Sequence, residues 1–297
     1  MAKVLLNKVT KRYGKLEAVK DLNLICKDKE FLVILGPTGA GKTTTLKMIA
    51  GIESISQGEI KIDGKMVNDL PSQERDVSMV FETYVLYPNL TVFENIASPL
   101  RTPRRRHNFP EKEIRRRVKK IAQVLEIGDL LNRMPAQLSG GQRQRVGLAR
   151  ALVRQTTVTL MDEPIAHLDA KLRNSLRGEL KRWQKDNNLT IIYTTHDYIE
   201  ALGMGDKIAV LNKGKLEQVG TPKQVYNSPA NEFVGLNIGY PPINIFRAHF
   251  ERKNGQLWVR SNILNILLPE NLAQKVIASI KESEVKVGIR PSNVKLH

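Results

Sequence analysis

The sequence predicts an α/β domain with a largely parallel sheet, followed by a small β-rich second domain. Short apolar runs alternate with helix-like patterns over residues 1–235, which is typical of a parallel sheet covered by helices. After this region Pro241-Pro242 interrupts the chain, and hairpin-like patterns follow. We therefore assign the first domain to residues 1–235 and the second to residues 236–297.

In the first domain the expected elements follow one another in strand–helix order. Each expected strand is a short apolar run, and each expected helix has apolar residues at helical spacing. The expected strands are 31–35, 77–81, 158–161, 190–194 and 207–211. The expected helices are 42–50, 142–153, 170–186 and 197–202.

A strongly basic insertion over residues 99–133 breaks this alternation, with arginine triplets at 104–106 and 115–117. Pro110 suits the first turn of a helix. Apolar residues then recur at helical spacing, at Ile114, Val118, Ile121 and Leu125. The pattern predicts an amphipathic helix whose basic outer face is either solvated or placed near anionic lipid headgroups.

The second domain has the pattern of a small antiparallel sheet. Asn254-Gly255 separates the segments 245–250 and 257–260, which predicts a hairpin with a two-residue turn. Residues 285–289 predict a further strand.

Composition excludes several classes of protein. With 41% hydrophobic residues the chain can bury a core, so it is not largely disordered. No apolar run approaches the about 18 residues of a membrane span. The apolar stretch at the N-terminus is too short for a signal peptide. Cys26 is the single cysteine and cannot form an internal disulfide, which favours a reducing cytosol.

The net charge of +17 is unusual for a chain of 297 residues. It indicates either a polyanionic partner or a basic surface that serves solubility. A nucleic acid, an anionic membrane surface and a phosphorylated ligand are all such partners, and composition alone leaves them open.

The apolar run 31–35 leads into a glycine-rich turn that matches the pattern GxxxxGK[ST] in strand–turn–helix context. Its glycines let backbone N–H groups approach phosphate oxygens, and the following helix adds the positive end of its dipole. Lys42 can contact the β- and γ-phosphates, and the Thr43 hydroxyl can bind Mg²⁺. The expected nucleotide-binding residues here are Gly36, Pro37, Thr38, Gly39, Ala40, Gly41, Lys42, Thr43 and Thr44.

A second apolar run, 158–161, ends in the adjacent carboxylates Asp162 and Glu163. At the C-terminal end of a parallel strand both can reach the crevice beside the phosphate-binding turn. One carboxylate can hold Mg²⁺, usually through water. The other can orient or deprotonate a water molecule for attack on the γ-phosphorus, whereas a kinase would need a second bound substrate there.

A third motif, Leu138 followed by Ser139, Gly140, Gly141 and Gln142, precedes a basic helix. On this motif the sequence resembles the nucleotide-binding subunits of ABC transporters, whose signature it matches in full. The serine suits a helix N-cap, and the glycines expose N–H groups to an anion. The resemblance implies that this surface faces the phosphate loop of a second copy, so that ATP lies between two subunits of a homodimer.

The resemblance also implies roles for single residues. Tyr13 matches the aromatic side chain that stacks on adenine, and His196 matches the switch histidine that contacts the γ-phosphate. Asp169 matches the aspartate of the loop that crosses the dimer interface. Asp162 and Glu163 match the magnesium-associated aspartate and the catalytic glutamate.

Two positions depart from the family's pattern. Glu82 stands where glutamine is usual, which keeps an oxygen ligand but adds a negative charge and loses a donor. We expect Glu82 still to coordinate Mg²⁺, although the added charge could also slow the reaction. Ala166-His167 replaces a small polar pair before Leu168. The expected catalytic residues are then Lys42, Glu82, Glu163 and His196, and the expected metal-binding residues are Thr43, Glu82 and Asp162.

Two further segments resemble importers of sugars and related solutes. Residues 85–96 are similar to the stretch that receives a membrane subunit in that group. Gly288-Ile289-Arg290-Pro291 is similar to part of the group's regulatory, oligomer-binding-like barrel. The resemblance covers 1–235, with a helical subdomain at about 87–155, and covers 236–297 more weakly. The tail is short for the group, so the barrel is either incomplete or its regulation reduced.

This branch implies an ATP hydrolase that drives uptake of a solute, with a carbohydrate expected. The implied partners are a second copy, two transmembrane permease subunits and, through the complex, an extracytoplasmic solute-binding protein. The implied location is the cytoplasmic side of the cell membrane. The alternative is a non-transport ABC ATPase acting on nucleic acid or the ribosome. Only 5% of residues are aromatic, so we expect no stacking platform for single strands and no nucleic-acid partner.

Overall fold

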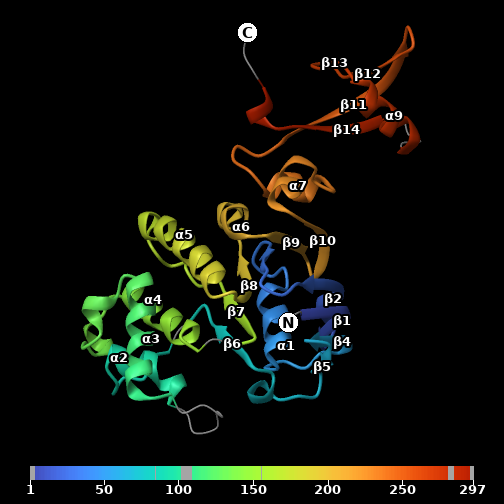
Figure 1. Ribbon diagram of the computed structural model, residues 1–297. Helices are drawn as coiled ribbons and strands as arrows, with labels where there is room; N and C mark the ends of the chain where they lie inside the picture. The colour runs from blue at the N-terminus through green and yellow to red at the C-terminus, as the bar shows by residue number, and fades with distance from the viewer. Residues whose placement is uncertain (1–3, 84, 102–108, 155, 280–283, 295–297) are drawn as a thin grey trace. The chain divides into compact units, whose positions relative to one another are not determined.

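The structure, a computed structural model, describes residues 4–83, 85–101, 109–154, 156–279 and 284–294. The chain divides into two compact units, Met1–Ser228 and Pro229–His297. In the described residues the first unit has two sheets and the second unit has one (Figure 1).

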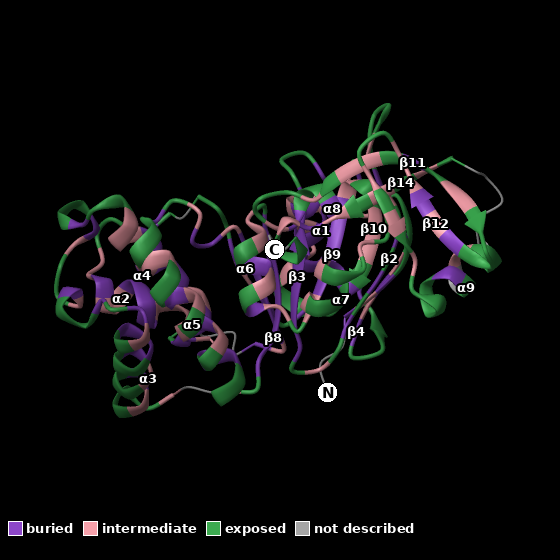
Figure 2. Ribbon diagram, turned by 90° about the horizontal axis from the view of Figure 1, so that it is seen from above, coloured by how far each residue is buried: buried purple, intermediate pink, exposed green. Residues whose placement is uncertain are grey.

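The first unit contains a six-stranded sheet with strand order β10-β9-β3-β8-β7-β6. Its neighbouring strands are parallel except β9 and β10, which confirms the predicted largely parallel sheet. Strands β3 and β8 are buried along their whole length, as Figure 2 shows in purple. The strands are β3 (Phe31–Leu35), β6 (Val77–Val80), β7 (Val158–Asp162), β8 (Thr190–Thr195), β9 (Lys207–Asn212) and β10 (Lys215–Gly220).

Helices α1, α3, α4, α5 and α6 of the first unit lie close to the predicted ranges, whereas α2 and α7 were not among the expected elements. Helices α1 and α5 have the predicted bounds, whereas α4 begins earlier because Ser139 caps it. Among the described residues no helix is both long and apolar enough to cross a membrane. The helices are α1 (Lys42–Ala50), α2 (Val92–Ala97), α3 (Glu111–Val124), α4 (Gly140–Leu152), α5 (Ala170–Asp186), α6 (Tyr198–Met204) and α7 (Pro222–Asn227).

A second sheet in this unit, with order β2-β1-β4-β5, was not among the expected elements. Its pairs are all antiparallel. Register shifts interrupt β1 and β2, where Lys8 and Asp21 adopt positive φ, and these break the apolar–polar alternation that marks a strand. The strands are β1 (Val4–Tyr13), β2 (Leu16–Cys26), β4 (Gln57–Ile62) and β5 (Lys65–Met66).

Helix α1 lies in the core that joins the two sheets. It contacts β6, β7 and β8 of the parallel sheet and β2 of the antiparallel one. Leu46, Met48 and Ile49 of α1 are fully buried together with side chains from both sheets. Since α1 begins at the glycine-rich turn, burial of its body fixes the position of its N-terminus.

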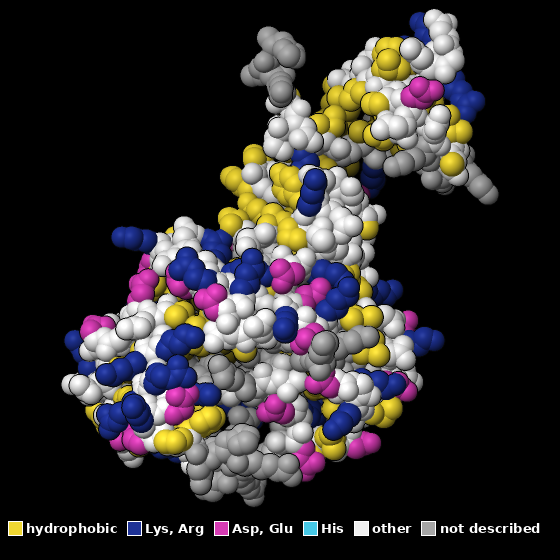
Figure 3. All heavy atoms as spheres, viewed as in Figure 1, with side chains coloured by type: hydrophobic (Ala, Val, Ile, Leu, Met, Phe, Trp, Pro, Cys, Tyr) yellow, Lys and Arg dark blue, Asp and Glu magenta, His cyan; other side chains and the backbone are white. Residues whose placement is uncertain are grey.

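The basic insertion forms α3, which packs against α2, α4 and α5. Ile114, Val118, Ile121 and Leu125 are buried, as the helical spacing predicted. On its outer face Arg116 and Arg117 bond Glu113 and hold the pKa of that carboxyl down at about 2. Figure 3 shows Lys and Arg side chains spread over this helical part with acidic ones between them. The arginines at 104–106 lie outside the described residues.

Arg75 closes the C-terminal end of α1. Its side chain is only 5% exposed, and its guanidinium donates to the carbonyl oxygens of Met48 at 2.7 Å, Leu70 at 2.8 Å and Asn68 at 3.1 Å. We expect Arg75→Met to lower the free energy of unfolding by about 2–4 kcal/mol, because these buried carbonyls lose their donor. Urea unfolding followed by circular dichroism measures the change.

Arg182→Met is the matched control. Arg182 lies exposed on α5 and pairs with Glu179 three residues earlier, an arrangement that contributes about 0.5 kcal/mol or less. Equal losses for the two variants would contradict the role given to Arg75.

The second unit is a four-stranded antiparallel sheet with order β13-β12-β11-β14. The predicted hairpin is present, with positive φ at both Asn254 and Gly255. Because different strands form its two edges, the described part of this sheet is open rather than a closed barrel. The strands are β11 (Asn244–Lys253), β12 (Gln256–Arg260), β13 (Asn265–Leu267) and β14 (Glu284–Ile289), with helices α8 (Glu232–Asn237) and α9 (Glu270–Ser279).

The division between the units differs from the sequence-derived boundary at 235/236, which falls inside α8. Arg290, buried beside β14, donates to the carbonyl oxygens of Gly235 and Ile238. These bonds join α8 to the second sheet.

Candidate functional site

The glycine-rich turn runs from the end of β3 to the start of α1, as its sequence predicted. Gly39 and Gly41 have φ of +79° and +97°, where a side chain would be strained. A Cβ at Gly36 would lie 2.4 Å from the carbonyl oxygen of Leu211, and one at Gly41 would lie 2.5 Å from that of Ala18. Packing thus requires glycine at both positions, independently of any ligand.

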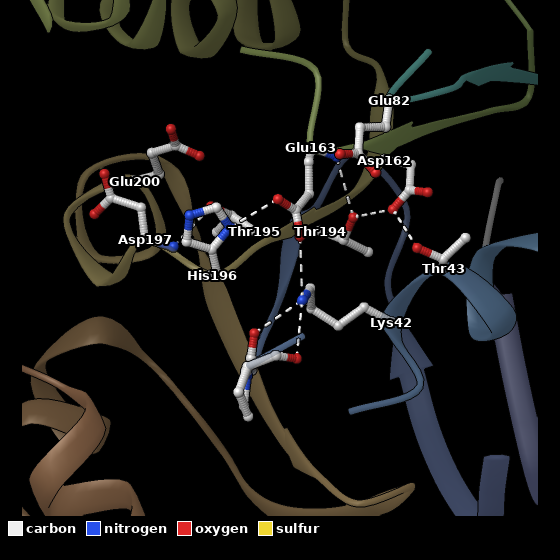
Figure 4. Close-up of polar contacts among 12 residues, drawn as sticks. Lys42, Thr43, Glu82, Asp162, Glu163, Thr194, Thr195, His196, Asp197 and Glu200 are labelled. Atoms are coloured by element: carbon white, nitrogen blue, oxygen red, sulfur yellow. Dashed lines mark hydrogen bonds and ion pairs between the residues drawn. The ribbon is translucent and has the colours of Figure 1, made fainter. Parts of the chain in front are cut away.

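Lys42 is the first residue of α1, and its side chain is 5% exposed. Its ammonium group donates to the carbonyl oxygens of Gly36 at 2.9 Å and Pro37 at 3.1 Å. It also lies 3.2 Å from Oε1 of Glu163 (Figure 4). The lysine charge is therefore held inside the loop, beside a carboxylate from β7's end.

Asp162, the last residue of β7, lies next to α1's first turn. Its Oδ1 accepts bonds from the hydroxyls of Thr43 at 3.0 Å and Thr194 at 2.7 Å. Burial raises the pKa of Asp162, and the nearby charges of Glu163 and Glu82 add to that rise, whereas the two hydroxyl bonds oppose it. Sequence reasoning missed Thr194. The expected parallel pairing of β7 and β8, which places Thr194 opposite Asp162, is the signal that could have found it.

Glu163 adopts φ of 44°, in the left-handed region, directly after β7. Its N–H donates to the carbonyl oxygen of Thr194 at 3.2 Å. Its carboxylate lies between Lys42 and His196, with Oε2 2.7 Å from Nδ1 of His196 (Figure 4). This turn directs Glu163 toward the loop while Asp162 faces Thr43, so the two adjacent carboxylates serve different neighbours.

Lys42, Thr43, Glu163 and His196 line one cavity of about 800 Å³, whereas Asp162 is not among its lining residues. Ten of the predicted site residues line it, namely Tyr13, Thr38, Gly39, Gly41, Lys42, Thr43, Thr44, Glu82, Glu163 and His196. Tyr13, one of these lining residues, is partly exposed, with Lys11 Nζ 4.8 Å from its ring centroid. Sequence reasoning missed further lining residues from β2 and later loops, among them Leu16, Glu17, Ala18, Lys20 and Lys213.

The two positions that depart from the family's pattern lie beside each other. Nε2 of His167 is 3.5 Å from Oε1 of Glu82, and both side chains line the cavity. The sequence alone does not predict this contact, because Glu82 follows β6 and His167 follows β7, and the two residues are far apart in the chain.

Comparison with known proteins decides the family. Residues 19–166 match the family model described as ABC transporter. The chain is 51% identical to the trehalose/maltose import ATP-binding protein MalK of Thermococcus litoralis, over 84% of this chain and 67% of that protein. It is 45% identical to the oligosaccharides import ATP-binding protein MsmX of Bacillus subtilis, over 99% of this chain and 79% of that protein.

A solved structure agrees. The dimeric bacterial ABC transporter cassette MJ0796 superposes with a TM-score of 0.67 at 34% identity, over 74% of this chain and 98% of that one. A second structure of that cassette is a dimeric post-hydrolysis state bound to ADP and phosphate. The chain belongs to the ABC transporter family. It is an ABC ATPase. It is an ATP-binding subunit of a transporter rather than a non-transport ABC ATPase.

The signature segment of this ABC ATPase does not line its own chain's cavity within the described residues. Ser139 caps α4, where its hydroxyl accepts from the N–H of Gln142 at 3.3 Å and its own N–H donates to the Gln142 side chain at 2.9 Å. Gly140 and Gly141 form the first turn of the same helix. Asp169 similarly caps α5, accepting from the N–H of Leu172 at 2.9 Å. The signature and Asp169 are thus ordered by their own helices.

Proposed function

We propose that this ABC ATPase powers an importer, with a carbohydrate as its solute. The observation that carries the catalytic part is the convergence of Lys42, Thr43 and Glu163 on one cavity, with Asp162 bonded to the Thr43 hydroxyl. The importer part is supported by the relatives, whose names assign them to import of trehalose, maltose and oligosaccharides.

The glycine-rich loop binds the triphosphate in this proposal. Backbone N–H groups of residues 36–44 and the N-terminus of α1 face its phosphates, and Lys42 neutralises charge on the β- and γ-phosphates. Tyr13 stacks on the adenine at the cavity's edge. Because Lys42 is already held by the loop carbonyls, little ordering is needed when the nucleotide binds.

The residues present fit Mg²⁺ as a companion of the nucleotide. Thr43 Oγ1 and Asp162 Oδ1 are oxygen donors 3.0 Å apart, and Glu82 adds a third oxygen donor at the same cavity. Mg²⁺ prefers one or two carboxylates combined with phosphate oxygens and water. When bound, the ion would neutralise charge on the β- and γ-phosphates.

Glu163 is positioned to assist hydrolysis. Its carboxylate accepts a proton from water as the water oxygen bonds to the γ-phosphorus and the bond to the β–γ bridging oxygen breaks, giving ADP and phosphate. His196, 2.7 Å from Glu163, keeps that carboxylate oriented and reaches the γ-phosphate. These groups act by position and charge rather than by forming a covalent intermediate.

A second copy completes the site. Ser139, Gly140, Gly141 and Gln142 cover the nucleotide bound by the partner's loop, and Asp169 crosses the interface. Among the described residues, the signature segment does not line the cavity of its own chain, which supports this arrangement. The dimeric state of the MJ0796 cassette supports it as well. ATP closes the homodimer and hydrolysis reopens it, which is a two-state cycle controlled by the γ-phosphate.

Two permease subunits receive this motion at the cytoplasmic side of the membrane, and an extracytoplasmic binding protein delivers the solute to them. A groove of about 380 Å³ beside the helical part supports such docking, with Val85, Phe81 and Pro99 in its lining. Val85 is 79% exposed although apolar, and Arg150 donates to its carbonyl oxygen at 2.7 Å.

Affinity capture of the tagged full chain from its own cells tests the importer role. We expect two membrane subunits to co-purify, and Val85→Asp to lose them without loss of ATP hydrolysis. Ile52→Asp, at another exposed apolar residue, is the control and should retain them. Enrichment of RNA with a steep salt dependence, and no membrane subunit, would instead favour the non-transport alternative.

A further inference from the structure

We propose that His167 is a positioning residue that holds the carboxylate of Glu82 at the mouth of the phosphate cavity. The inference deepens the proposed function and rests on it, because Glu82 matters only if MgATP binds there. In this proposal the two departures from the family's pattern act together, because His167 interacts with Glu82.

The geometry places the pair in the segments that follow two adjacent strands. Glu82 follows β6 and His167 follows β7, and these strands pair in parallel. The imidazole Nε2 lies 3.5 Å from the carboxylate, with the side chains 59% and 49% exposed. At this distance and exposure the contact is weak, and either side chain can be substituted without disturbing a buried core.

The segment that carries His167 is itself well held. The N–H of Ala166 donates to the carbonyl oxygen of Glu163 at 3.3 Å, which closes a turn. The side chain of Gln144, from α4, donates to the carbonyl oxygen of Pro164 at 2.7 Å. His167 is therefore presented from a fixed backbone, and its ring can limit where Glu82 lies.

Charge explains why such a partner is needed. A glutamine at position 82 would be neutral, but Glu82 adds a third carboxylate to a site that already contains Asp162 and Glu163. The ammonium group of Lys42 is occupied by Glu163 and two loop carbonyls. His167 supplies an N–H group that can bond the Glu82 carboxylate and limit where it lies at the cavity.

A double-mutant cycle on the full chain tests the pair. The four proteins are wild type, Glu82→Gln, His167→Ala and the double variant, assayed for kcat and KM for MgATP and for the Mg²⁺ concentration at half-maximal rate. We expect His167→Ala to lower kcat/KM about three- to fivefold, mainly through KM. In the Glu82→Gln background the same change should alter kcat/KM less than about twofold.

Two more variants separate positioning from general structure. His167→Asn keeps a side-chain N–H donor and should retain kcat/KM within about twofold of wild type. His249→Ala, at an exposed histidine of the second unit, should match wild type. An equal effect of His167→Ala in both backgrounds, or no effect in either, would overturn the proposal.

The outcomes also distinguish this inference from the function beneath it. If Lys42→Ala abolishes MgATP binding while the cycle is additive, the His167 role alone fails. If Lys42→Ala leaves MgATP binding intact, the assignment of the site fails, and the pair loses its basis with it.

Discussion

Replacing Lys42 by alanine is expected to weaken MgATP binding by more than about a hundredfold and to abolish measurable hydrolysis. The ammonium group is the buried cation of the glycine-rich loop and lies 3.2 Å from Glu163. Its loss removes the charge-assisted bonds to two phosphates, and each such bond contributes about 1.5–3 kcal/mol. Equilibrium binding of a fluorescent ATP analogue with Mg²⁺, together with phosphate release, measures both effects.

Lys47→Ala is the matched control for this prediction. Lys47 belongs to the same helix but lies in its last turn, at the opposite end from the cavity. The Lys47→Ala protein should bind MgATP with the affinity of wild type. Circular dichroism checks that both variants keep the native helix content. Unchanged nucleotide affinity in a folded Lys42→Ala protein would refute the loop's assignment.

Glu163→Gln is expected to slow ATP hydrolysis about 10²- to 10⁴-fold and to convert the protein into an MgATP-dependent dimer. Glutamine has nearly the same shape as glutamate but cannot accept the proton of the attacking water, a function worth about that factor in other enzymes. Binding by Lys42 and Thr43 remains, so the closed homodimer accumulates. Light scattering with size-exclusion chromatography, with and without MgATP, measures the mass.

Two controls accompany the dimer experiment. Glu179→Gln, on the surface of α5 where Glu179 pairs with Arg182, should hydrolyse ATP normally and form no trapped dimer. The Lys42→Ala, Glu163→Gln double variant should stay monomeric because it cannot bind the nucleotide that joins the copies. A monomer of Glu163→Gln at saturating MgATP would count against completion of the site by a second copy.

The features that the sequence predicted correctly are those encoded in a short, continuous stretch of the chain. The strand 31–35, the turn after it and helix α1 were predicted with their bounds, since apolar runs, glycines and helical spacing act within about ten residues of chain. The seam of α3 and the Asn254-Gly255 hairpin were predicted for the same reason. Strands β1 and β2 of the antiparallel sheet were missed because bulges at Lys8 and Asp21 erase the alternation that identifies strands.

The sequence by itself determined the parallel α/β fold, the phosphate-binding loop and the family, because each is encoded in contiguous residues whose types permit few other conformations. Only the tertiary structure decided which distant side chains meet. The bond from Thr194 to Asp162 depends on the register between β7 and β8, and the pairing of Glu82 with His167 depends on turns after β6 and β7. Such contacts depend on how strands align across the sheet, which no single stretch of chain specifies.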